Sequence, residues 1–190
     1  MTGFQYPVSL DLTDVAVLVV GAGPVAARKV AGLAAAGARV RLVAPDVSDA
    51  LDQALVADVR RRPYERADLE GVRLVVTATG DAGVDATVAA DATAAGIWVN
   101  AADRPADCTF ILPAIVRNGP LSIAVSTDGA SPALARRLRD RAGELLTDEV
   151  VVLAADLAGR RADVRAGGGS TEDVDWSGLI DAVVPPIAPH

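Results

Sequence analysis

Short apolar runs alternate with helical patterns over the first part of the chain. Five runs have the length and β-branched content of buried strands: Val15–Val20, Arg39–Ala44, Val59–Arg62, Leu74–Ala78 and Ile97–Asn100. The segments between them predict helices at Ala26–Ala36, Asp49–Ala57 and Asp81–Ala95. Strands and helices alternate in this way when helices cover both faces of a parallel sheet. The pattern therefore predicts an α/β, Rossmann-type doubly wound fold.

The pattern changes after this alternating part. Two apolar runs with an Asn-Gly step between them, Phe110–Ile115 and Leu121–Ser126, favour a β-hairpin. A Ser-Pro pair then begins a helix that is predicted over Ser131–Leu146, with serine as N-cap and proline at the first helical position. The tail is predicted to hold a continuing or separate helix, a flexible glycine-rich linker and a weak last helix: Val150–Ala158, Arg165–Thr171 and Asp173–Val184.

A glycine-rich turn follows the first strand. Gly21 permits the tight turn, Gly23 lets a phosphate approach the backbone, and the small Ala26 allows close packing of helix on strand. The helix start adds free N–H groups and a positive dipole end. Because the turn lies between a strand and a helix, we interpret it as a dinucleotide pyrophosphate site with Gly21, Gly23, Pro24 and Val25 as contacts. The alternative is an ordinary turn between a strand and a helix.

The end of the second predicted strand is the usual place for an acid that binds the adenosine ribose. The chain reads Ala44-Pro45-Asp46 at this point. We expect Asp46 to accept hydrogen bonds from the ribose and to favour NAD over NADP, because a carboxylate repels a 2′-phosphate. The alternative is that Asp46 is a solvated turn residue. Thr79 and Gly80, at the end of another strand, are expected to line the other side of the cofactor crevice.

Composition and charge exclude several classes of protein. The 190 residues carry a formal net charge of -7, which disfavours binding to nucleic acid or to an anionic membrane. Cys108 is the only cysteine and His190 the only histidine, so we expect neither a preformed metal site nor a catalytic histidine. Lys29 is the only lysine. Because no signal-peptide pattern and no apolar run of membrane-spanning length is found, we expect a cytoplasmic protein.

Two motifs carry a family resemblance. NxxDxPxxCxFxxPA begins at Asn100 and SxxGxSPxLAxxLR begins at Ser126. Together with the glycine-rich segment, they make residues 6 to about 146 similar to the precorrin-2 dehydrogenase/sirohydrochlorin ferrochelatase family, the dehydrogenase module of siroheme synthase. The resemblance implies oxidation of precorrin-2 to sirohydrochlorin with NAD⁺. Some members of this family then insert Fe²⁺ to give siroheme, so the resemblance leaves this second activity possible here.

The resemblance also implies site residues. Asp103 matches the aspartate implicated in catalysis, and a partly buried carboxylate there can act as general base. Its alternative role is to cap a turn before Pro105. Ser126 and Thr127 match hydroxyl positions of the site, although both can instead cap the turn before the following helix. Asp128 departs from the glycine that is common in the family.

Precorrin-2, the substrate that the resemblance implies, carries eight carboxylates, so an acidic protein must gather positive charge locally to bind it. Arg104, Arg117 and Arg136 are the candidates for substrate binding, and the alternative for each of them is a solvated surface arginine. We expect an NAD-binding Rossmann domain over residues 1–112 and a partly flexible helical tail over 148–190, and the resemblance implies a homodimerisation region over 113–147.

Two other functions remain open at this level. One is a regulatory module that senses a dinucleotide without catalysis, and the other is an NAD-dependent dehydrogenase of a different small anion. Asp103 in its motif and the arginine-rich helix favour the precorrin-2 enzyme, because a sensor needs neither feature.

Overall fold

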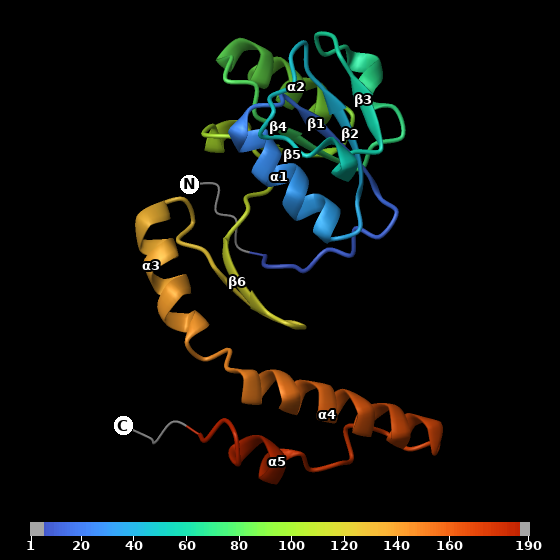
Figure 1. Ribbon diagram of the computed structural model, residues 1–190, viewed down its shortest axis with the longest axis vertical. Helices are drawn as coiled ribbons and strands as arrows, with labels where there is room; N and C mark the ends of the chain where they lie inside the picture. The colour runs from blue at the N-terminus through green and yellow to red at the C-terminus, as the bar shows by residue number, and fades with distance from the viewer. Residues whose placement is uncertain (1–5, 187–190) are drawn as a thin grey trace. The chain divides into compact units, whose positions relative to one another are not determined.

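The computed structural model describes residues 6–186, and the chain divides into two compact units, Met1–Leu112 and Pro113–His190 (Figure 1). We call these the first unit and the second unit. The expectations that concern His190 and the extreme N-terminus fall outside the described residues. Within residues 6–186, no helix is both long and apolar enough to cross a membrane.

The first unit is built on a parallel sheet of five strands in the order β3-β2-β1-β4-β5. Its strands are β1 Ala16–Val20, β2 Arg39–Val43, β3 Asp58–Arg60, β4 Leu74–Thr77 and β5 Trp98–Ala101. The strand order reverses at β1, between β2 and β4, as in a doubly wound fold. The prediction of a Rossmann-type α/β fold is therefore confirmed.

Alternate residues of β1 point to opposite faces of the sheet, and each face has its own core. Val17 and Val19 belong to one cluster, which includes Val30 of helix α1 (Pro24–Ala35). Leu18 and Val20 belong to the other cluster, which includes residues of helix α2 (Ala82–Ala94). Because β1 is apolar at every position, it is buried on both faces, as expected for a central parallel strand.

The predicted helix over Asp49–Ala57 is wrong. The structure has only a single 3₁₀ turn there, Gln53–Leu55, whose first free N–H is capped by the side chain of Asp52. Leu51 is buried in this segment, whereas most of its neighbours are exposed. Since one anchored side chain does not make an apolar helix face, the segment forms a short turn instead.

The second unit begins with an antiparallel hairpin of β6 (Ala114–Asn118) and β7 (Leu121–Val125). Gly119 in the turn has a φ of +54°, which supports the Asn-Gly reasoning. The predicted strand Phe110–Ile115 begins too early, because the observed strand β6 starts at Ala114. Phe110 lies in the first unit, where its carbonyl accepts a hydrogen bond from Asn100 Nδ2.

Three helices follow the hairpin: α3 Pro132–Gly143, α4 Asp148–Ala166 and α5 Ser177–Asp181. The hydroxyl of Ser131 caps α3 by accepting from Leu134 N, as predicted, but α3 ends before Leu146. Thr147 caps α4, so α4 is a separate helix rather than a continuation of α3.

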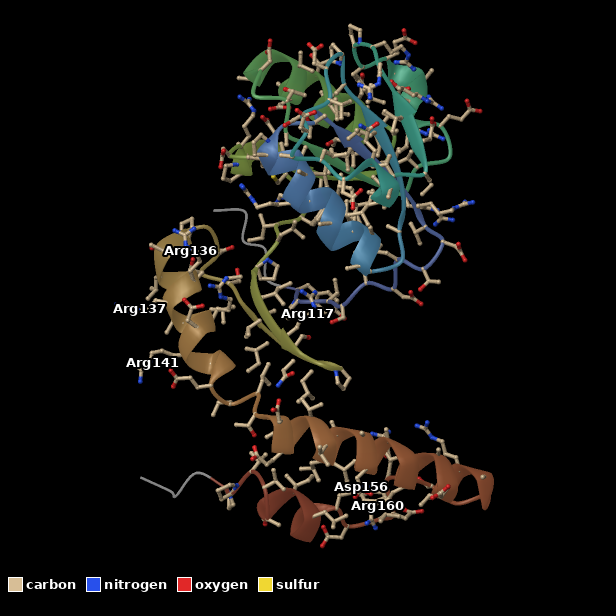
Figure 2. All side chains as sticks on the ribbon, in the orientation of Figure 1. Arg117, Arg136, Arg137, Arg141, Asp156 and Arg160 are labelled. Carbon is tan, nitrogen blue, oxygen red and sulfur yellow. The ribbon has the colours of Figure 1, made fainter. Side chains whose placement is uncertain are left out.

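The tail differs from the prediction in two places. Helix α4 extends into the start of the predicted linker, as far as Ala166, and carries the ion pair Asp156–Arg160 on its surface (Figure 2). Helix α5 occupies only part of the predicted Asp173–Val184 segment. Asp175 accepts a hydrogen bond from Ser177 N just before this short helix, whose N-cap, Trp176, makes no side-chain capping bond.

Candidate active site

The turn between β1 and α1 is forced to contain glycine at its first position. Gly21 has a φ of +102°, and its N–H donates to the carbonyl of Val43 at the end of β2. A Cβ atom at this position would lie 2.3 Å from the carbonyl oxygen of Ala78. Gly21 is therefore required by the close approach of the segment that follows β4.

Gly23 has a different role in the same turn. It is the N-cap of α1, its φ is -78°, and no side chain caps the helix start. A Cβ atom here would meet nothing within 4 Å. The start of α1 thus has no side-chain cap and has open space beside Gly23, with Pro24 at the first helical position and the small Ala26 fully buried. This cradle fits a pyrophosphate, which needs N–H donors and a close backbone approach.

A pocket of about 350 Å³ lies beside this turn, at the carboxyl ends of β4 and β5. Val25 of α1 lines it on one side, and Gly80 of the β4–α2 connection lines another. Asp103 and Arg104, which follow β5, complete the wall. The pocket therefore brings together four residues that the sequence singled out, in the crevice where open α/β sheets bind their ligands.

Asp85 is a pocket residue that the sequence reasoning missed. Its buried carboxylate accepts hydrogen bonds from the hydroxyl of Thr77, from Thr79 N at 3.1 Å and from Thr79 Oγ1 at 2.8 Å. These bonds tie the end of β4 to α2 and fix the conformation of Thr79-Gly80. An acid in the first turn of a helix that follows a Thr-x-Thr strand end was the available signal.

Asp103 adopts a left-handed backbone with a φ of +58°, in the turn directly after β5. Aspartate tolerates this region better than most side chains, but such a conformation still costs about 1 kcal/mol or more. The prediction that Asp103 is partly buried is wrong, because the residue is exposed at the pocket wall. The neighbouring Arg104 is paired with Asp107, which holds its guanidinium within the same loop.

The loop that carries Asp103 is closed by a polar network. Asn100, buried on β5, donates to the carbonyl of Phe110 at 3.1 Å and contacts Cys108 Sγ at 3.7 Å. Cys108 Sγ accepts from Ala101 N at 3.2 Å, and burial raises the pKa of this thiol. Lys29 Nζ of α1 donates to Asn100 Oδ1 at 3.4 Å. Neither Lys29 nor Asn100 was a site candidate in the sequence.

Asp46, the expected ribose contact, lies in the loop after β2. Ala44 is buried, Pro45 is exposed, and Asp46 lies exposed in the bend that follows the strand. Ser48 N donates to the carbonyl of Ala22 at 3.2 Å, so this loop is attached to the glycine turn. The exposure of Asp46 fits both the ribose contact that we expect and the alternative of a solvated turn residue.

Ser126 and Thr127 lie in the second unit, and their hydroxyls are engaged in the turn before α3. Thr127 Oγ1 accepts from Ser131 N and donates to Ser131 O, both at 3.1 Å. Ser126 Oγ accepts from Asp128 N at 3.2 Å. These contacts are those of the alternative interpretation, in which both hydroxyls cap the turn.

Asp128 also has a left-handed backbone, with a φ of +52°. Glycine adopts this conformation without strain, which gives a physical reason for the glycine that the family commonly has there.

The remaining candidate arginines also belong to the second unit. Arg117 is exposed on β6, and Arg136 is exposed on α3 together with Arg137 and Arg141 (Figure 2). Arg139 of the same helix is paired with Asp140. Among residues 6–186, no three His, Cys, Asp or Glu side chains are grouped to hold a metal ion.

The sheet order, the glycine turn and the adjoining pocket define a dinucleotide-binding α/β protein. Residues 8–114 match a family model described as "Putative NAD(P)-binding". Residues 118–141 match a second model, described as "Sirohaem biosynthesis protein central". The two matches lie next to each other along the chain.

Individual relatives agree with these matches. The chain is 40% identical over 184 residues to siroheme synthase of Methylobacillus flagellatus and 52% identical over 126 residues to that of Pseudomonas putida strain F1. The alignments cover 94% and 65% of this chain, but the chain spans only 39% and 27% of those relatives. A solved structure of SirC, precorrin-2 dehydrogenase, superposes with a TM-score of 0.70 and 30% identity, over 94% of this chain and 87% of SirC. The chain belongs to the precorrin-2 dehydrogenase/sirohydrochlorin ferrochelatase family, whose dehydrogenase module is part of siroheme synthase.

Proposed function

We propose that this protein oxidises precorrin-2 to sirohydrochlorin with NAD⁺ as electron acceptor. The proposal rests on one observation: the start of α1 after the glycine turn and the turn after β5 line the same pocket. The glycine turn supplies Val25 to the pocket wall, and the turn after β5 supplies the carboxylate of Asp103. A dinucleotide site next to an exposed base is what a coupled hydride and proton loss requires.

The residues have separate roles in this proposal. Gly21, Gly23, Pro24 and Val25 hold the pyrophosphate, while Asp46 accepts from the adenosine ribose. NAD⁺, when bound, supplies the hydride acceptor. Asp103 takes the proton that the macrocycle releases, so that two electrons and one proton leave as hydride and a second proton goes to the carboxylate.

The substrate contacts come from arginines. Arg104 lines the pocket next to Asp103, and its pairing with Asp107 holds it at the wall. Arg117 and Arg136 are exposed cations of the second unit and are assigned to carboxylates of the substrate. Thr127 and Ser126 support the turn near these arginines in the chain, rather than acting as bases.

The second unit is proposed to form a homodimer. Helices α3 and α4 expose the large apolar side chains Leu134, Leu138 and Val152, and Leu145 is exposed in the connection between the two helices. Large apolar side chains that are exposed on two consecutive helices are typical of a helical interface.

The proposal is tested by incubating the purified protein with precorrin-2 and NAD⁺ and recording visible spectra. Sirohydrochlorin should form in the wild type, with NAD⁺ preferred over NADP⁺ because of Asp46. Failure to form it would reject the function, and equal rates with both cofactors would reject the role of Asp46. Adding Fe²⁺ to sirohydrochlorin in a parallel assay tests whether this chain also inserts the metal.

Asp103→Asn should lower kcat by about a hundredfold or more, since a general base contributes roughly 10²–10⁴ in rate. Asparagine accepts the left-handed backbone, so the fold and the affinity for NADH, measured by calorimetry, should not change. Asp49→Asn, the same change at an exposed residue outside the pocket, is the matched control. A wild-type kcat in Asp103→Asn would remove this residue from catalysis.

A further inference from the structure

Lys29 is the one lysine among 18 basic residues of this chain, and it lies on α1. Its side chain is half-buried, and Nζ donates to Asn100 Oδ1 at 3.4 Å. The two residues are 71 positions apart in the sequence. This hydrogen bond therefore joins the first helix to the strand that precedes Asp103.

Asn100 also contacts the loop that holds Asp103. Its amide nitrogen donates to Phe110 O at 3.1 Å and contacts Cys108 Sγ at 3.7 Å. Cys108 Sγ in turn lies 3.4 Å from the carbonyl oxygen of Arg104. The network fixes residues on both sides of Asp103, whose left-handed backbone is tolerated only when its surroundings hold it.

The position of Lys29 is unfavourable for stability. Burial lowers the pKa of Lys29, which means that its charge is poorly solvated in the folded protein. The electrostatic effects of Cys108 and Asp103 act in the opposite direction and raise this pKa, whereas the neighbouring Arg28 lowers it further. Among the described residues, no carboxylate lies within ion-pair distance of its Nζ atom. A residue that only filled space here would not need a charge.

We propose that Lys29 is a positioning residue for Asp103, acting through Asn100 and through its own positive charge. It anchors the network that fixes the turn after β5, and it offsets the negative charge of Asp103 when a polycarboxylate substrate arrives. The inference rests on the proposed function, in which Asp103 is the base. Lys29 is not assigned any contact with the substrate.

The kinetic test compares three variants. Lys29→Met should lower kcat about tenfold or more with little change in KM, because misplacing a base costs rate rather than binding. Lys29→Arg keeps the charge and a donor and should recover most of the rate. Arg28→Met removes the same charge from the exposed neighbour and should keep the wild-type kcat.

A second measurement does not depend on activity. Because the chain has one lysine, selective ¹³C labelling of lysine gives one side-chain signal, whose titration reports the pKa of Lys29 directly. Asp103→Asn should lower this pKa, and Arg28→Met should raise it, since these residues act on Lys29 in opposite directions.

The outcomes separate the two proposals. If the wild type does not oxidise precorrin-2, the proposed function fails, and the lysine titration still decides whether Lys29 and Asp103 interact. If Asp103→Asn leaves the titration of Lys29 unchanged, or if Lys29→Met keeps the wild-type kcat in an active protein, the positioning role is overturned.

Discussion

At the scale of single residues, the two glycines of the β1–α1 turn are required for different reasons. Gly21 is required by the fold, because its backbone is left-handed and a Cβ would strike the carbonyl of Ala78. Gly23 has an ordinary φ and free space around it, so the fold makes no such demand. Its missing side chain matters only if a ligand occupies that space.

This contrast gives a prediction. Gly23→Ala should change the free energy of unfolding by less than about 1 kcal/mol, the usual range for an N-cap change, while weakening NADH binding about tenfold or more. Gly21→Ala should lower the free energy of unfolding by about 2 kcal/mol or more. Chemical denaturation and calorimetry with NADH measure both quantities. If Gly23→Ala binds NADH as the wild type does, the pyrophosphate does not lie at this turn.

At the scale of elements, the connection from β3 to the 3₁₀ turn Arg66–Leu69 depends on one buried carboxylate. Asp68 accepts from Arg60 Nη1 at 2.6 Å, from Arg62 Nη1 at 2.8 Å and from Glu65 N at 2.9 Å. Burial raises the pKa of Asp68, but the bonds from Arg62, Glu65 N and Arg60 outweigh it and hold the pKa at about 2. The pair of arginines thus compensates a charge that would otherwise be costly to bury.

The stability of this connection should depend on pH. Because the folded pKa of Asp68 lies below its ordinary 3.8, its contribution is complete above about pH 4 and is lost as the pH falls towards 2. Asp68→Asn should lower the free energy of unfolding by about 3 kcal/mol at pH 7, and this difference should shrink below pH 4. Urea denaturation over a pH series measures both effects.

Asp58→Asn is the matched control, because Asp58 also pairs with Arg60 but its side chain is 44% exposed. Its loss should change the free energy of unfolding by less than about 1 kcal/mol. A pH-independent difference between Asp68→Asn and the wild type would contradict the assigned role of the carboxylate.

Some helices and strands could be predicted from the sequence, and others could not. The central strands were predictable, because runs such as that of β1 are apolar on both faces and only a covered parallel sheet accommodates them. The predicted helix over Asp49–Ala57 was wrong. Leu51 is its one buried apolar residue, and the side chain of Asp52 caps a short 3₁₀ turn there instead. The roles of Asp85 and Lys29 were not predictable, since each depends on contacts that only the fold creates.

At the scale of the whole molecule, the proposed homodimer is open to a direct test. Leu134→Asp combined with Leu138→Asp should convert a dimer into a monomer, because both side chains are exposed on α3 and a charge there opposes burial in an interface. Light scattering coupled to gel filtration measures the mass. Val84→Asp, a change at an exposed apolar residue of α2 in the first unit, should leave the mass unchanged. A monomeric wild type would reject the interface.

The two tryptophans of the chain are divided between its two units. Trp98 begins β5 and is 52% exposed, while Trp176 precedes α5 and donates its Nε1–H to Thr171 O. Each unit therefore carries its own fluorophore. Replacing either one by phenylalanine leaves an emission signal from a single unit, so fluorescence can follow the unfolding of each unit separately and reveal whether the two melt together.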